Sequence, residues 1–111
     1  MNTEQEALLR DMVGRIVAEA SPEQVVLFGS WARGAGTLDS DVDLLVVERD
    51  RFGPGRSRRA EMTRLRRALQ DFPVPIDILV YSHDEVTHWR EARNHVIARA
   101  MREGRVLYEA R

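Results

Sequence analysis

The apolar residues of this chain follow two patterns, one with helical spacing and one of short continuous runs. Helical spacing recurs in three segments, residues 3–20, 57–72 and 82–103. Short apolar runs, mostly rich in Val, Leu and Ile, occupy residues 24–28, 41–47, 76–81 and 105–108. Side chains that return every three or four positions indicate amphipathic helices, whereas short β-rich runs are typical of buried strands. The mixture of the two predicts an α/β (α+β) fold.

Small polar residues and glycines predict where these elements begin and end. Thr3 and Ser57 stand where N-caps of two helices would lie, and Ser82 with Glu85 matches a capping box for a helix that continues to residue 103. Gly104 is expected to end that helix. Ser30 is expected to cap a short helical turn after the first strand.

Three carboxylates stand at the starts of two predicted strands. Asp41 and Asp43 are two residues apart, so they project from the same face of their strand. Neighbouring carboxylates repel each other and are costly to desolvate, which a divalent cation would offset. Asp77 is the single charge in the third apolar run. It has two explanations: an ion pair with an Arg, or a place beside Asp41 and Asp43 if the two strands pair.

Gly29 and Ser30 follow the first strand directly, and Arg33 comes one helical turn later. A strand–Gly–Ser–helix junction exposes backbone N–H groups that suit an anion, and a guanidinium suits phosphate oxygens. The alternative is an ordinary turn with a capping Ser and a solvated Arg.

Composition narrows the functions that remain. The length of 111 residues predicts one domain, residues 1–111. The chain has no Cys, and all 17 basic residues are Arg, which excludes thiolate sites, Schiff bases and P-loop lysines. A net charge of −1 makes direct nucleic-acid binding unexpected. No apolar run approaches the roughly 20 residues needed to span a bilayer, so we expect a cytoplasmic protein without membrane contact.

The helix predicted over residues 57–72 carries an arginine-rich outer face. Such a face is usually solvated, and the alternative is a docking surface for an acidic partner or nucleic acid. The sequence leaves this choice, and association into an oligomer, open.

Together these features match the requirements of two-metal phosphoryl transfer. Asp41, Asp43 and Asp77 would bind two Mg²⁺ ions, while Gly29, Ser30 and Arg33 would hold the phosphates of ATP or another nucleoside triphosphate. Asp77 would help deprotonate or orient the incoming hydroxyl.

Gly29-Ser30, ten residues and then Asp41-Val42-Asp43 resembles the signature of the polymerase-β-like nucleotidyltransferase superfamily. The segments GSWARG and SDVDLLVV look most like its minimal nucleotidyltransferase (MNT) domains. The resemblance implies a palm-type nucleotidyltransferase fold, with a small mixed sheet of about four strands flanked by about four helices. It implies that Asp41 and Asp43 bind both metals and Asp77 the catalytic one, and that Gly29 and Ser30 contact the phosphates.

The resemblance also implies a partner, because MNT domains are commonly the antitoxin half of toxin–antitoxin systems with a HEPN-domain ribonuclease toxin. The expected reaction is transfer of AMP from ATP onto a tyrosine of that toxin. Two alternatives are a non-catalytic antitoxin that neutralises its toxin by docking, and nucleotidylation of a small molecule or an RNA end.

Overall fold

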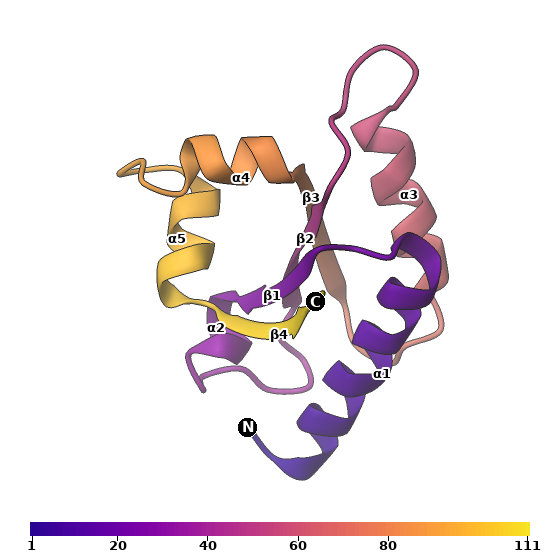
Figure 1. The fold of residues 1–111 in the computed structure, drawn as a ribbon. Coiled ribbons are helices and arrows are strands. Elements are labelled where there is room, and N and C mark those ends of the chain that lie inside the picture. The colour runs from indigo at the N-terminus through magenta and orange to yellow at the C-terminus, as the bar shows by residue number, and fades with distance from the viewer.

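The computed structural model describes residues 1–111 and contains a four-stranded sheet with helices on both faces (Figure 1). The strands are β1 (Gln24–Phe28), β2 (Val42–Glu48), β3 (Ile76–Ser82) and β4 (Arg105–Glu109). The helices are α1 (Thr3–Ala20), α2 (Gly29–Ala32), α3 (Arg58–Ala68), α4 (His83–Trp89) and α5 (Val96–Glu103). The predicted class and number of strands are confirmed. No helix combines the length and the apolar character that crossing a bilayer requires.

The strands form a mixed sheet in the order β3-β2-β1-β4. β2 and β3 are parallel, whereas β1 is antiparallel to both β2 and β4. The register places Asp43 opposite Asp77 on one side and opposite Phe28 on the other. β3 and β4 lie at the two edges of the sheet.

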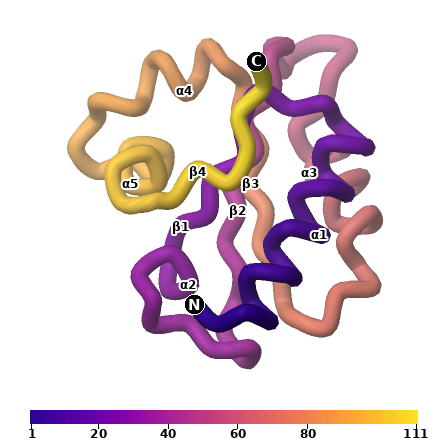
Figure 2. The backbone as a smooth tube through the Cα atoms, turned by 60° about the horizontal axis from the view of Figure 1, so that its bottom comes forward, coloured from indigo at the N-terminus to yellow at the C-terminus, as the bar shows by residue number.

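Alternate side chains of the strands enter two separate hydrophobic clusters. The larger one lies under α1 and α3 and contains, among others, Leu9, Met12, Ile16, Val42, Leu44, Val46, Leu65, Ile78 and Val80. The smaller one lies under α4 and α5 and contains Val26, Leu45, Val47, Val86, Ile97 and Ala100. Figure 2 shows the two helix pairs on opposite sides of the sheet. Because strand residues alternate between faces, Asp43 and Asp77 belong to the side that α4 and α5 cover.

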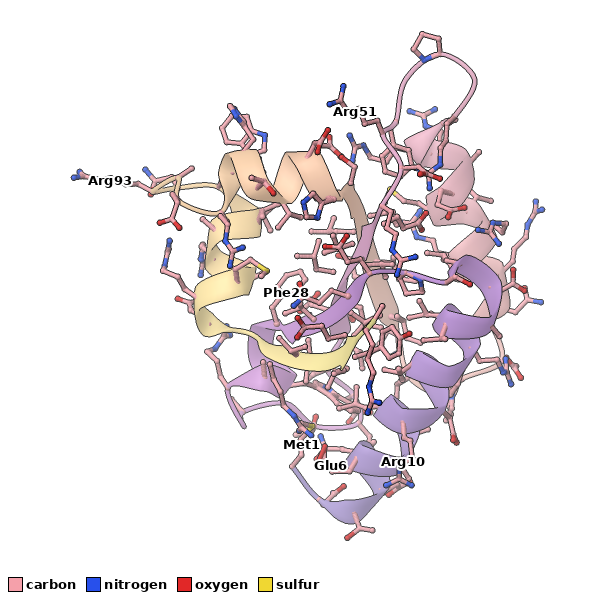
Figure 3. All side chains as sticks on the ribbon, viewed as in Figure 1. Met1, Glu6, Arg10, Phe28, Arg51 and Arg93 are labelled. Atoms are coloured by element: carbon pink, nitrogen blue, oxygen red, sulfur yellow. The ribbon has the colours of Figure 1, made fainter.

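Two predictions about helix ends are wrong. The segment expected to be one helix from Ser82 to residue 103 is two helices, separated by a turn that carries the exposed Arg93 away from the molecule (Figure 3). His95 starts the second helix, since its Nδ1 accepts a hydrogen bond from the backbone N–H of Ile97. The N-cap of α1 is Asn2 rather than Thr3. The Ser57 cap and the Ser82–Glu85 capping box are confirmed.

A buried glutamate closes the end of β2 that lies far from the carboxylates. Glu48 is only 3% exposed and forms an ion pair with Arg56. Burial, together with a hydrogen bond and repulsion from Glu61, raises the pKa of Glu48 to about 7. The pKa of Glu61 is lowered by Glu48 and Arg64, against the effect of its own burial. Ionisation of Glu48 is therefore unfavourable in the folded protein, whereas ionisation of Glu61 is favoured.

We expect Glu48→Gln to flatten the pH dependence of stability above pH 4.5. A carboxyl with a pKa raised from 4.5 to about 7 contributes stability below 4.5 and loses it as the pH rises through 7. The free energy of unfolding of the wild type should therefore fall over this interval, and that of Glu48→Gln should not. Urea unfolding at several pH values measures this, with the exposed Glu91→Gln as control. Equal slopes for wild type and Glu48→Gln would contradict the assignment.

Candidate active site

The three carboxylates singled out in the sequence meet at one end of the sheet. Asp43 on β2 and Asp77 on β3 are directly paired in the parallel register, and neighbouring strands lie about 4.8 Å apart. Asp41 lies one residue before β2. Burial raises the pKa of Asp43, and the charges of Asp77 and Asp41 raise it further, whereas Arg33 lowers it. Asp43 is thus the centre of a cluster of negative charge within electrostatic reach of one cation.

Both explanations that the sequence offered for the charge of Asp77 apply in the structure. Its strand pairs with β2, which confirms the predicted pairing and brings it opposite Asp43. Arg66 Nη2 also lies 4.0 Å from Asp77 Oδ1, at the limit of an ion pair. The Asp77 side chain is 59% exposed, so this contact is a weak, solvated one. The carboxylate therefore remains accessible from solvent.

The chemistry of these donors fits a hard divalent cation. Carboxylate oxygens are the ligands that Mg²⁺ prefers, and a cation would relieve the repulsion that raises the pKa of Asp43. No three His, Cys, Asp or Glu side chains converge closely enough in this structure to hold a metal ion by themselves. Mg²⁺ bound at these carboxylates would therefore need water and substrate oxygens to complete its coordination.

Gly29 lies directly against Asp43. Its backbone has φ +72°, the left-handed region that favours glycine. A Cβ atom at this position would lie 2.1 Å from Asp43 Oδ2, closer than any real contact. The glycine is therefore required twice, for the backbone turn at the end of β1 and for the space that the Asp43 carboxylate occupies.

Ser30 has a different local role from the predicted one. The short helix α2 begins at Gly29, its N-cap is Phe28, and no side chain caps it. The prediction that Ser30 caps this turn is therefore wrong. Its carbonyl accepts the N–H groups of Ala35 and Gly36 at 3.0 and 3.1 Å, which folds the following loop back on the turn. The first N–H groups of α2, which have no partner within a helix, are left without a side-chain cap.

Trp31 fixes the loop between Gly29 and Asp41. Its side chain is fully buried, and its indole N–H donates to the carbonyls of Thr37 and Ser40 at 3.0 and 3.3 Å. A Cβ at Gly36 would lie 2.3 Å from the indole ring, so the loop closes tightly over it. Trp31 also belongs to the larger hydrophobic cluster. Its second role, holding the loop that leads to Asp41, depends on carbonyl positions that no residue pattern reveals.

A pocket of about 330 Å³ opens beside Gly29, between the end of β1 and α5. Phe28, Gly29 and Arg33 line one side of it, and Asn94, Arg99 and Glu103 line the other. Figure 3 shows Phe28 between β1 and α5. The sequence predicted Arg33 at this site but neither Asn94 nor Arg99. Their approach to Gly29 depends on the turn between α4 and α5, which the sequence pattern did not predict.

Two of the five arginines of α3 make close contacts within the fold. Arg58 pairs with Glu85 and donates to the carbonyl of Val80, while Arg64 pairs with both Glu61 and Glu19. The guanidinium of Arg58 also lies 4.8 Å from the ring centres of both Phe52 and Tyr81. These contacts give Arg58 and Arg64 a structural role.

The chain is similar to a known protein family and to several solved structures. A family model described as a nucleotidyltransferase domain matches residues 9–107. A candidate minimal nucleotidyltransferase of known structure is 27% identical over 95% of each chain, with a TM-score of 0.61. A candidate nucleotidyltransferase from Sulfolobus solfataricus is 19% identical over 93% of this chain and 78% of its own, with a TM-score of 0.63.

A third similar structure is a toxin–antitoxin with AMP-PNP, whose matching chain is 17% identical with a TM-score of 0.59. The match covers 93% of this chain and 74% of that one. No curated protein matches the chain in sequence. The family match spans nearly the whole chain, and the predicted nucleotidyltransferase fold is confirmed. This protein therefore belongs to the nucleotidyltransferase domain family.

Proposed function

We propose that this chain is an Mg²⁺-dependent nucleotidyltransferase that moves AMP from ATP to a tyrosine hydroxyl of a HEPN-domain toxin, and so acts as its antitoxin. One observation carries the proposal. Asp43 stands opposite Asp77 in the sheet, and Gly29 in its left-handed conformation lies against the Asp43 carboxylate. Carboxylates for the metal and a close backbone approach for phosphates thus lie side by side.

Asp41, Asp43 and Asp77 are the residues that would hold the metal. Bound Mg²⁺ would neutralise the triphosphate and stabilise charge that develops on the attacking and leaving oxygens. Burial first, and then the charges of Asp77 and Asp41, raise the pKa of Asp43, so a cation beside it would favour its ionised form.

The residues around the carboxylates would orient the nucleotide for in-line attack. Uncapped N–H groups at Gly29 and Ser30 and the guanidinium of Arg33 would bind phosphate oxygens. The acceptor oxygen forms a bond to the α-phosphorus, and the bond from that phosphorus to the bridging oxygen breaks. The bridging oxygen keeps the electron pair and departs with pyrophosphate. The proton of the acceptor hydroxyl passes to the carboxylate of Asp77, whose exposure lets it pass on to solvent.

Two facts support a protein hydroxyl as the acceptor. Asp77 lies on an edge strand and is 59% exposed, so a side chain of another protein can reach it. A toxin–antitoxin with AMP-PNP contains a chain with the same fold.

Incubation with ATP labelled at the α-phosphate, Mg²⁺ and the HEPN protein encoded beside this chain should label that protein. Asp43→Asn should abolish the labelling, because the amide keeps the shape of the side chain but loses the charge that binds metal. Asp39→Asn, in the exposed loop before β2, serves as the control and should label normally. Labelling by Asp43→Asn at the wild-type rate would refute the proposal.

A toxicity assay in cells tests the alternative that the protein neutralises its toxin by docking alone. If Asp43→Asn protected cells from the toxin as well as the wild type does, binding alone would account for antitoxin action. Label on an RNA end or a small hydroxylated molecule, with none on the HEPN protein, would show that the acceptor is not a protein.

We also expect Asp43→Asn to raise the thermal unfolding midpoint in the presence of EDTA. The pKa of Asp43 is raised in the fold by burial and by Asp77 and Asp41, so its ionised form destabilises the native state near neutral pH. Added Mg²⁺ should raise the midpoint of the wild type but leave that of the variant unchanged. Scanning calorimetry with and without Mg²⁺ measures both effects. A lower midpoint for the variant in EDTA would contradict this electrostatic account.

Gly29→Ala should reduce nucleotide transfer by roughly a hundredfold, since a misplacement of about 1 Å at a reacting group has this effect. The new methyl group would displace the Asp43 carboxylate, which lies 2.1 Å from the Cβ position. Gly34→Ala is a matched control, because Gly34 also has a left-handed backbone (φ +76°) but nothing lies within 4 Å of its Cβ position. Steady-state rates compare the two variants. Similar losses in both would attribute the effect to backbone strain alone.

A further inference from the structure

The pocket beside Gly29 has two guanidinium groups that the fold leaves almost without partners. Arg33 is exposed and forms no ion pair or side-chain hydrogen bond. Arg99 on α5 has a single contact, 3.9 Å from Glu103, and its side chain is 63% exposed. An exposed pair of this kind, one helical turn apart, adds little stability. Both cations are therefore free to bind an anion that enters the pocket.

The position of the pocket relative to the carboxylates indicates how a bound molecule would lie across the sheet. Asp77, Asp43 and Phe28 form one row across β3, β2 and β1, and strands are spaced by about 4.8 Å. The carboxylates stand at one end of this row, and the pocket opens at the other, beyond Phe28 and Gly29. A molecule lying along the row meets negative charge first and then two guanidinium groups.

We infer that this pocket binds the pyrophosphate end of the nucleotide, and that Arg99 of α5 together with Arg33 positions it for departure. The inference depends on the proposed nucleotidyl transfer and adds to it a positioning residue from a helix outside the sequence motif. With the α-phosphate beside Asp43, the β- and γ-phosphates extend past Gly29 toward the two guanidinium groups. Guanidinium donors match phosphate oxygens in geometry as well as in charge.

The size and chemistry of the pocket favour phosphates over the nucleoside. A volume of about 330 Å³ is at the lower end for ligand pockets and suits a fragment rather than a whole nucleotide. Asn94 adds amide donors at the same mouth. Glu103 would compete with the phosphates for Arg99, so its carboxylate limits how tightly the product is held.

The test is equilibrium binding of pyrophosphate and of AMP to the full chain with Mg²⁺, by titration calorimetry. Arg99→Ala should weaken pyrophosphate binding roughly tenfold to a hundredfold, as expected for a lost charge-assisted hydrogen bond, and leave AMP binding unchanged. Arg99→Lys should restore part of the loss. Arg102→Ala removes the same charge from the same helix outside the pocket and should have little effect. Glu103→Gln should tighten pyrophosphate binding a fewfold.

Inhibition of the transfer reaction provides a second measure of pyrophosphate binding. In the transfer assay, inhibition by added pyrophosphate should weaken in Arg99→Ala by the same factor as binding. Unchanged pyrophosphate affinity in Arg99→Ala, or an equal loss for AMP and pyrophosphate, would overturn the inference while leaving the transfer reaction intact. If the wild type binds neither AMP nor pyrophosphate, the proposed function itself fails, and the inference fails with it.

Discussion

The register between β2 and β3 is the constraint on which the site depends. It aligns Asp43 with Asp77, and burial together with repulsion from Asp77 and Asp41 raises the pKa of Asp43. The opposite face of the same strands, with Val42, Leu44, Ile78 and Val80, is fully buried under α1 and α3. A slip of one residue would turn these apolar side chains to solvent and the carboxylates into the core. Hydrophobic burial on one face therefore holds like charges together on the other.

The ten-residue interval between Ser30 and Asp41 has a geometric meaning in this fold. β1 and β2 are antiparallel, so the chain must leave the end of β1, reverse, and return with Asp43 opposite Phe28. Trp31 holds the reversing loop in place, because its buried indole N–H donates hydrogen bonds to the carbonyls of Thr37 and Ser40. A fixed path of this kind has little tolerance for a changed length, which is why the spacing of the motif carries so much information.

Local patterns predicted the elements well, and contacts between distant residues explain what they missed. Apolar runs gave the four strands, and the even spacing of Asp41 and Asp43 gave the face they share. The division of the last helix was not predictable, since residues 90–95 contain no Gly or Pro and His95 acts as a cap only through its Nδ1 contact. Glu48 is another example. Its sequence neighbours give no sign of the Glu61 carboxylate that, with burial, raises its pKa to about 7.

The unpredicted turn between α4 and α5 has a consequence for specificity. A single helix from Ser82 to residue 103 would continue away from the strand that precedes it, whereas the turn sends α5 back toward the end of β1 (Figure 1). Gly104 makes the final approach possible, because a Cβ there would lie 2.3 Å from the carbonyl of Ala100 and 2.7 Å from that of Leu27. Asn94 and Arg99 reach the pocket beside Gly29 only through this path. In the proposed reaction, the motif residues would supply the reacting end of the site, and the returning helix would supply residues that bind pyrophosphate.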